Sequence, residues 1–252
     1  MSNIYFECNN GISGDMAVAA LLDAGASREK LEKALDSINT ENEFSYTIKD
    51  IKVNSIKATD FDVILKEHHS FEHHQEHHHR HCHRNLADVI TVIDKADISE
   101  NAKSLAKKIF TIVAESEAAV HALPINEVHF HEVGAVDSIA DIVGFSVLYD
   151  DINPEKVFFS ALTEGTGTVE CQHGVMNVPV PAVCEISSKY RLPLKITTNN
   201  GEMVTPTGAA IVAALYTGEK LPEEIIIEKT GNGAGKRPYP NPVLRVILFN
   251  RR

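Results

Sequence analysis

The sequence lacks the features that mark several large classes of protein. No apolar run approaches the length of a membrane-spanning helix, and the first ten residues, MSNIYFECNN, have neither the basic start nor the apolar stretch of a secretory signal. The four cysteines, at positions 8, 82, 171 and 184, form no CxxC pair, so a disulfide framework is not expected. We therefore expect a cytoplasmic protein with free thiols and no membrane partner.

The chain also has fewer basic than acidic residues. The chain of 252 residues has 35 acidic and 24 basic side chains, and its formal net charge is −11. Nucleic-acid backbones bind to clustered lysine and arginine, so no nucleic-acid partner is expected. Metal cations are easier partners, although a few backbone amides and one or two local cations are enough to bind a small anion.

Two catalytic motifs are missing as well. No serine or cysteine stands in a nucleophile elbow, and no GxGxxG sequence follows a strand in the context of a dinucleotide-binding fold. Hydrolase and dinucleotide-binding functions therefore lose support.

Strand and helix patterns alternate along the chain. A short strand at 4–8 is followed by a glycine turn at 11–14 and a helical run at 15–24. Period-two alternation predicts a hairpin of strands 44–53 and 56–65 around an Asn-Ser turn. Further helices are expected at 27–38, from residue 86, and at 99–123, 135–150, 182–190 and 205–216, with strands at 156–161, 224–229 and 243–249. The predicted class is α/β, with a mixed sheet and flanking helices.

What the sequence has in excess is histidine. Nine of its 13 histidines lie at 67–85, in the segment EHHSFEHHQEHHHRHCHRN. Imidazole binds nickel, zinc and copper, so this segment is interpreted as a disordered metal-binding loop. The candidate ligands are His68, His69, His73, His74, His77, His78, His79, His81 and His83. The composition leaves open whether the metal is stored, delivered or used in catalysis.

A second cluster of metal-ligand type is Glu127-Val128-His129-Phe130-His131. In an extended segment its carboxylate and two imidazoles point to one face, and such a set leaves metal positions open for substrate or water. Ordinary, partly buried polar groups explain the spacing equally well. Downstream, Asp137 and Asp141 are one helical turn apart. They could bind metal, orient a histidine or act as acid and base, but Asp137 could also merely favour a helix N-terminus.

Three turns have the groups that bind phosphate. The turn at 11–15 joins a strand to a helix but lacks the lysine of a Walker loop. The sequence TPTG at 205–208 begins a helix and is either an anion site or a plain cap. The sequence GNGAGKR at 231–237 combines a flexible backbone with two cations. The candidate phosphate-binding residues are Gly11, Ser13, Gly14, Asp15, Thr205, Thr207, Gly233, Gly235 and Lys236.

The chain resembles the LarC family, whose members insert nickel into the pincer cofactor of lactate racemase. The resemblance rests on five blocks in this order: IYFECNNGISGDM, the histidine tract ending HRNLADV, HFHEVGAVDSIADIVG, GTGTVECQHGVMNVPVPA and VTPTGAAI. The chain departs from the family at its start, with Glu7 for an aspartate and Asn9-Asn10 for Phe-Ser. The resemblance implies that residues 1–252 correspond to the family's N-terminal region, without its C-terminal nucleotide-binding domain.

The resemblance implies a CTP-dependent nickel cyclometallase of the lyase class, acting on pyridinium-3,5-bisthiocarboxylic acid mononucleotide. Nickel, CTP with a divalent cation, a separate C-terminal domain and apo lactate racemase are the implied cofactors and partners, and a homo-oligomer is compatible with them. The histidine tract would collect nickel, His129 and His131 would place it, and Asp137 or Glu132 would be the base. The alternatives are a non-catalytic nickel store or delivery protein and a generic metal-dependent phosphohydrolase.

Overall fold

A mixed sheet forms the centre of the protein. The computed structural model describes residues 2–39, 42–66, 84–128, 136–171 and 174–251. The sheet has the strand order β2-β3-β9-β10-β1-β4, and two smaller sheets pair β5 with β8 and β6 with β7. The strands are β1 (Asn3–Glu7), β2 (Phe44–Val53), β3 (Ile56–Leu65), β4 (Val157–Phe159), β5 (Leu162–Thr166), β6 (Thr168–Cys171), β7 (Gly174–Asn177), β8 (Leu194–Asn200), β9 (Ile225–Ala234) and β10 (Val243–Arg251). Because β1 pairs in parallel with β4 and antiparallel with β10, the predicted mixed sheet is confirmed.

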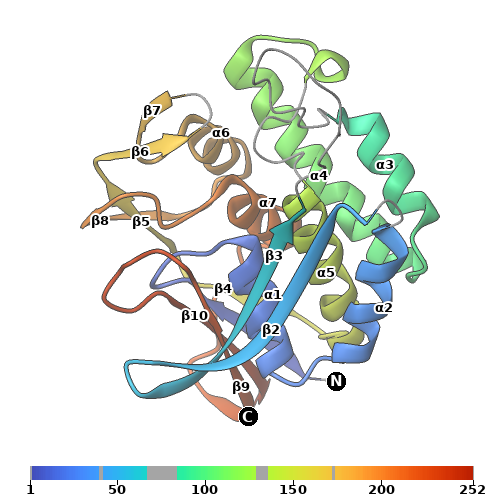
Figure 1. The fold of residues 1–252 in the computed structure, drawn as a ribbon. Coiled ribbons are helices and arrows are strands. Elements are labelled where there is room, and N and C mark those ends of the chain that lie inside the picture. Colours follow the sequence, from blue (N-terminus) through green and yellow to red (C-terminus); the bar gives the residue numbers. More distant parts are fainter. Residues whose placement is uncertain (1, 40–41, 67–83, 129–135, 172–173, 252) are drawn as a thin grey trace.

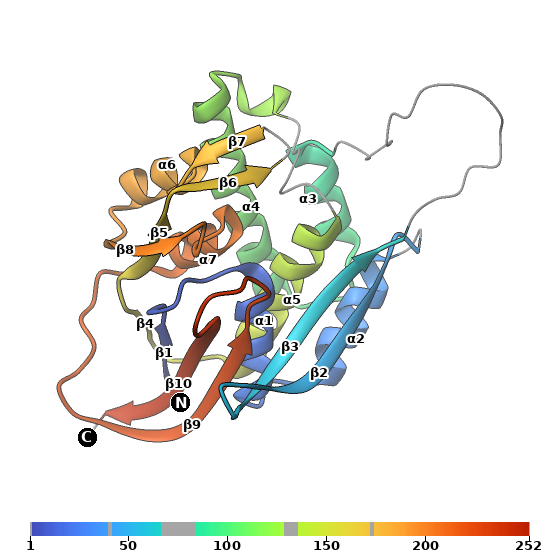
Figure 2. The same cartoon turned by 60° about the vertical axis from the view of Figure 1, so that its left-hand side comes forward.

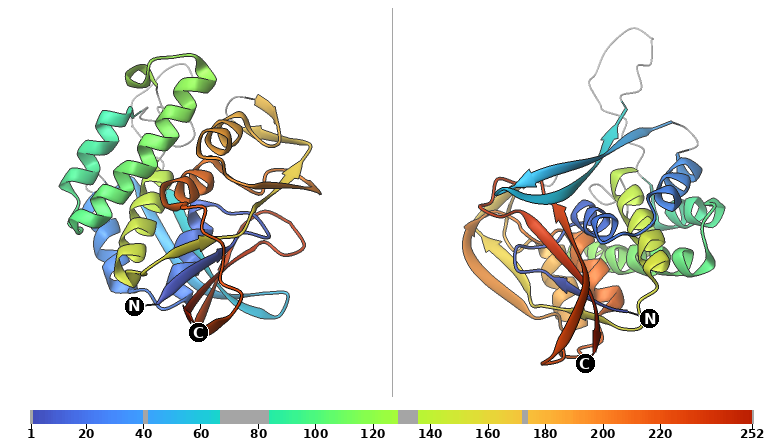
Figure 3. Two further views of the ribbon diagram at one scale, coloured as in Figure 1. Left: turned by 180° about the vertical axis from the view of Figure 1, so that it is seen from behind. Right: turned by 90° about the horizontal axis from the view of Figure 1, so that it is seen from below.

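Helices cover one face of this sheet (Figures 1 and 3). Helix α1 contacts β9, β3 and β10, α5 packs against α1 and α2, and α4 lies against α5, α6 and α7. The helices are α1 (Gly14–Asp23), α2 (Arg28–Ile38), α3 (Leu86–Lys95), α4 (Glu100–His121), the 3-10 turn η1 (Ile125–Glu127), α5 (Val136–Ile152), α6 (Pro181–Tyr190) and α7 (Pro206–Leu215). The predicted α/β class with flanking helices is confirmed, and none of the described helices is long and apolar enough to cross a membrane.

The helix starts follow the capping residues of the sequence. The side chains of Ser27 and Ser99 accept backbone N–H bonds from the first turns of α2 and α4. Asn85 and Asp88 form a reciprocal capping box at the start of α3. Helix α1 is buried on nearly every side, because it is enclosed between the sheet and α5. Its first turn therefore lies between the sheet and α5, with Asp15 left partly exposed.

The predicted hairpin is formed by β2 and β3, which pair along their whole length. Asn54 and Ser55 connect them with positive φ angles of 50° and 68°, as a two-residue type I′ turn requires. The hairpin diverges from β9 (Figure 2), with which β3 is in register at Thr59 and Gly233. Strand β3 ends at Leu65, just before residues 67–83, which lie outside the described part of the chain.

The structure corrects the prediction of a flexible loop at 231–234, because these residues belong to strand β9. A Cβ atom at Gly231 would lie 2.2 Å from the carbonyl oxygen of Ala20, and one at Gly233 would lie 2.0 Å from that of Met16. Glycine at these positions lets helix α1 pack directly on the strand. The glycine pattern therefore reflects close packing between helix and strand.

Gly233→Ala is expected to lower the free energy of unfolding by about 2 kcal/mol, because the added methyl group meets helix backbone that cannot move aside. Gly235→Ala is the matched control. Its Cβ atom would come closest to the flexible Met16 side chain, at 2.9 Å, so a smaller loss is expected. Urea denaturation measures both variants, and equal losses would contradict the packing explanation.

Candidate functional site

Three helices begin at one pocket, which has a volume of about 360 Å³. It is lined by Ser13, Gly14 and Asp15 of the α1 start, Asp137, Ser138 and Asp141 of α5, Thr205, Pro206 and Thr207 of the α7 start, and by Val63, Glu202, Lys236 and Arg237. An adjoining hollow of about 180 Å³ shares six of these residues and adds Gly235. Helix N-termini carry partial positive charge and unpaired N–H groups, so this place in the fold favours a bound anion.

Local hydrogen bonds hold the helix starts in place. The Ser13 hydroxyl donates to the Asp15 carboxylate, and the Thr205 hydroxyl accepts the N–H of Gly208 at 3.1 Å. Asp137 accepts the N–H of Ser138 at 2.8 Å. Thr205 therefore caps α7, and Asp137 also stabilises the helix N-terminus to which it belongs.

Lys236 lies among carboxylates at the pocket. Its ammonium group forms an ion pair with Asp62 of β3 and lies 3.7 Å from an oxygen of Asp15. Burial alone would lower the pKa of Lys236, but the hydrogen bond with Asp62 and the charges of Asp15 and Asp60 raise it above its usual value. Lys236 is therefore a charged group with more than one negative neighbour.

Arg237 is the second cation of the pocket. Its guanidinium donates to the carboxylate of Glu202 at 2.5 Å, and the side chain of Glu202 is only 8% exposed. The hydroxyl of Tyr239 donates to the Glu202 carbonyl oxygen at 2.7 Å. Glu202 therefore orients Arg237 in the lining of the pocket, where a guanidinium is suited to bidentate binding of phosphate or carboxylate.

Burial raises the pKa of both aspartates on α5. The pKa of Asp141 is well above its usual value because of burial, with the charges of Asp15 and Asp137 adding to the shift. Burial likewise raises the pKa of Asp137, although the N–H of Ser138 and the charge of Lys236 oppose the change. A carboxylate with a raised pKa is a better proton acceptor near neutral pH, which suits a general base.

Asp141→Asn is expected to raise the free energy of unfolding at pH 7, because burial raises the pKa of Asp141 and makes its charged form costly in the folded protein. The raised pKa means that the folded protein holds a proton on Asp141 more tightly than the unfolded chain does. The destabilisation caused by charged Asp141 therefore disappears as the pH falls through the folded-state pKa. The extra stability of the Asp141→Asn variant should vanish below about pH 4, where the carboxyl is protonated in both the folded and the unfolded chain. Urea denaturation at both pH values measures this, and a variant less stable than the parent at pH 7 would contradict it.

The predicted metal ligands lie outside the described residues. This applies to the nine tract histidines, to His129 and His131, and to the candidate base Glu132. Glu127, in η1, is described and exposed. Within the described ranges no group of three or more His, Cys, Asp or Glu side chains is arranged to hold a metal ion. The metal sites therefore stay predictions.

Most of the described candidates from the sequence meet at the pocket. The joined hollows are lined by Ser13, Gly14, Asp15, Asp137, Thr205, Thr207, Gly235 and Lys236. Gly11 and Gly233 do not line them. Gly11 has a φ of 87°, and a Cβ atom there would lie 2.0 Å from the carbonyl oxygen of Met203, so it serves chain packing.

Sequence reasoning missed Glu202 and Asp62. The alternation of Asp60 and Asp62 with buried Phe61 could have indicated polar side chains on one strand face.

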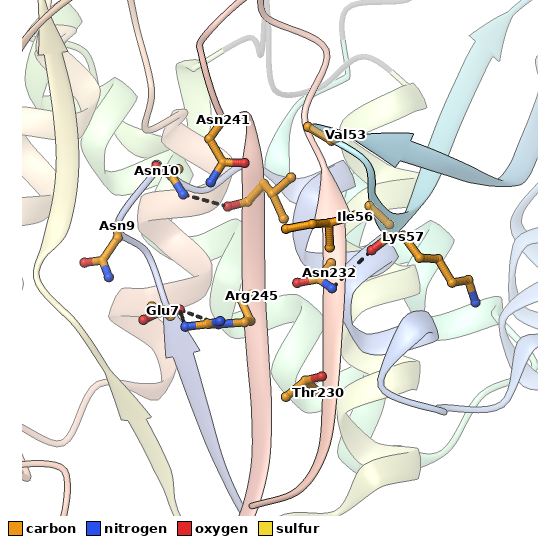
Figure 4. A pocket seen from close by; sticks show the side chains of 12 residues that line it. Glu7, Asn9, Asn10, Val53, Ile56, Lys57, Thr230, Asn232, Asn241 and Arg245 are labelled. Carbon is orange, nitrogen blue, oxygen red and sulfur yellow. Dashed lines mark hydrogen bonds and ion pairs between the residues drawn. The ribbon is translucent and has the colours of Figure 1, made fainter.

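A larger hollow of about 500 Å³ lies elsewhere, across β1, β10, β9 and the turn of the hairpin (Figure 4). Several of its polar groups bind one another: Arg245 donates to Glu7 at 2.5 Å, and Asn232 donates to the carbonyl oxygen of Lys57 at 3.2 Å. None of the described candidates from the sequence lines it. The pocket at the three helix starts is therefore the better candidate site.

Comparison with known proteins defines the class of this α/β protein. A family model described as "Nickel insertion protein" matches residues 4–252, so the chain belongs to that family. The resemblance to LarC proteins is thereby confirmed. No solved structure matches the chain.

Curated relatives carry a more particular name, "Pyridinium-3,5-bisthiocarboxylic acid mononucleotide nickel insertion protein". The protein with this name from Alkaliphilus metalliredigens is 49% identical over 99% of this chain and 61% of its own length. That from Acetivibrio thermocellus is 43% identical over 100% of the chain and 61% of its own length. The protein with this name from Akkermansia muciniphila is 42% identical over 98% of the chain and 60% of its own length. The chain thus spans about three fifths of the length of these relatives.

Proposed function

We propose that this chain takes part in inserting nickel into pyridinium-3,5-bisthiocarboxylic acid mononucleotide, and that the mononucleotide binds where α1, α5 and α7 begin. The observation that carries the proposal is the meeting of three helix N-termini, two cations and several aspartates at one pocket. The phosphate group suits the helix starts, Lys236 and Arg237, and the carboxylates suit the incoming metal cation.

The chemistry requires a base close to the ring of the substrate. A ring C–H bond breaks, its electron pair forms the bond between carbon and nickel, and the proton needs an acceptor. We assign this proton to the carboxylate of Asp137, whose raised pKa supports the role. Glu132 is the alternative base. His129 and His131 are proposed to hold the nickel ion before the transfer.

Other parts of the reaction belong to the same proposal. CTP with a divalent cation is the proposed co-substrate, and the formation of the bond between carbon and nickel makes the proposed reaction that of a cyclometallase of the lyase class. A C-terminal domain carried on a separate chain is the proposed partner for CTP, and apo lactate racemase is the proposed acceptor of the finished cofactor. The reaction is placed in the cytoplasm, and association of several copies of the chain is compatible with it.

Reconstitution tests the function directly. The purified chain is mixed with nickel, CTP and the mononucleotide, with and without a separately produced C-terminal domain, and apo lactate racemase is then added. Racemase activation in either mixture supports nickel insertion, and activation without the second chain excludes a pure storage role. Nickel binding without activation in both mixtures would favour the store or delivery alternative. Phosphate release from unrelated esters would favour the phosphohydrolase alternative.

Deletion of residues 67–82 is expected to remove most of the nickel bound per chain while sparing insertion when nickel is saturating, because the tract is proposed to collect metal rather than to perform chemistry. Equilibrium dialysis measures the nickel, and racemase activation measures insertion. A tract of equal length made of serine and glutamine is the control for spacing. Complete loss of insertion at saturating nickel would instead make the tract catalytic.

A further inference from the structure

A buried carboxylate lies beneath one wall of the candidate pocket. Glu164, in strand β5, has no exposed surface. Its Oε1 atom accepts three backbone N–H groups, those of Gly165 at 2.8 Å, Met203 at 2.6 Å and Val204 at 3.1 Å. Its Oε2 atom is buried without a hydrogen-bond partner. Burial of a carboxylate is costly, and the three N–H groups that donate to Oε1 offset that cost in part while Oε2 stays unpaired.

The segment that Glu164 holds, residues 202–205, forms a wall of the pocket. Glu202 and Thr205 line the pocket itself. The same segment is bound to the turn before α1 by two backbone hydrogen bonds. The N–H of Ile12 donates to the carbonyl oxygen of Met203 at 3.0 Å, and the N–H of Thr205 donates to the carbonyl oxygen of Ile12 at 3.1 Å. Movement of this segment would therefore displace two of the helix starts that define the site.

The same segment also orients Arg237. The Glu202 carboxylate accepts from its guanidinium, and the backbone of Glu202 immediately precedes the N–H of Met203 that Glu164 binds. Burial raises the pKa of Glu164, while its backbone hydrogen bonds and the positive charge of Arg237 counteract the shift. Arg237 therefore lies in the field of two carboxylates, one that it contacts and one buried behind the segment.

We propose that Glu164 is a positioning residue, whose buried negative charge fixes residues 202–205 and, through Glu202, directs Arg237 toward the phosphate of the bound mononucleotide. The inference rests on the proposed function, because it needs the mononucleotide in this pocket. Glu164 touches neither the substrate nor the metal. It acts through the backbone that carries Glu202 and Thr205.

Glu164→Gln tests the role of the charge, because glutamine keeps the shape and one acceptor oxygen. Calorimetry measures binding of the mononucleotide and of its dephosphorylated nucleoside to the purified chain. The ratio of the two affinities isolates the contribution of the phosphate. We expect this ratio to fall about tenfold in the variant, the size of effect typical of a weakened hydrogen bond to a charged group. Binding of the nucleoside is expected to change little.

Asp23→Asn is the matched control. Asp23 is also a largely buried carboxylate, with 10% of its side chain exposed, and it accepts a backbone N–H from Asn232 at 2.8 Å, but it lies at the far end of α1 from the pocket. This variant is expected to lose stability and to keep the affinity ratio. A role in stability alone would leave the ratio unchanged in both variants, and this result would overturn the inference.

The arms of the experiment separate the two proposals. If the parent chain binds mononucleotide and nucleoside equally, the phosphate is not bound at this pocket and both proposals fail. If the parent discriminates and Glu164→Gln discriminates equally well, only the positioning role fails. If Glu164→Gln does not fold, Glu164→Asp replaces it as the test variant. Aspartate keeps the negative charge on a side chain that is one methylene group shorter. A reduced ratio in that variant supports the role, and an unchanged ratio overturns it.

Discussion

Asp137→Asn is expected to slow nickel insertion by about 100-fold or more, the lower range for loss of a general base, while the affinity for the mononucleotide changes little. Asparagine keeps the size of the side chain and one oxygen that can accept the N–H of Ser138, so α5 should begin at the same residue. What is lost is the ability to accept a proton. The rate of apo lactate racemase activation at saturating substrate and nickel measures the effect.

Asp151→Asn, in the last turn of the same helix, is the control for a change of charge on α5. Asp151 forms an ion pair with Lys30 at 2.6 Å and does not line the candidate pocket. Its variant is expected to insert nickel at the parent rate. Full activity of Asp137→Asn would remove Asp137 from the reaction and leave Glu132 as the candidate base. Loss of nickel binding, rather than of rate, would identify Asp137 as a metal ligand.

Lys236→Gln is expected to weaken mononucleotide binding by about tenfold to 100-fold, because a hydrogen bond to a charged group contributes about 1.5–3 kcal/mol. The variant also leaves Asp15 and Asp62 without their shared cation. Affinity of the pocket for a divalent cation should therefore rise while affinity for the phosphate falls. Calorimetric titration with the mononucleotide and with nickel measures the two changes in opposite directions.

Lys57→Gln is the matched control for this variant. Lys57 also lies between two aspartates, 3.4 Å from oxygens of both Asp23 and Asp50, but outside the candidate pocket. Its variant is expected to bind mononucleotide and nickel as the parent does. If both lysine variants weakened mononucleotide binding equally, the effect would come from overall charge and the proposed place of the phosphate would be wrong.

Much of the fold could be predicted because the signals that define it are local. The period-two pattern around Asn54 and Ser55 predicted the hairpin, and the helices predicted from 27, 86 and 99 do begin beside the caps Ser27, Asn85 and Ser99. Each depends on residues within one or two turns of one another. The glycines at 231–234 were misinterpreted because their reason lies far away in sequence, in the backbone of α1.

The candidate site was predicted in pieces but not as a whole. The segments near Ser13, Asp137 and Thr205 were each recognised as helix starts with useful polar groups, yet no local pattern indicates that they share a pocket. Glu202 and Asp62 were missed for the same reason, since their value depends on meeting Arg237 and Lys236 from other elements. Local rules identify such groups, and only tertiary packing shows which of them act together.

Strand β3 of the hairpin leads from the candidate pocket to the segment that precedes the histidine tract in the sequence. Strand β3 runs from its register with β9 at Thr59, through the ion pair of Asp62 with Lys236, to its end at Leu65, beyond which the histidine tract follows. If a phosphate bound as proposed draws Lys236 to itself, this ion pair weakens and the free energy of the strand changes. If metal bound to the tract as proposed shifts β3, thermodynamic reciprocity requires that it change pocket affinity by the same factor by which a pocket ligand changes affinity for that metal.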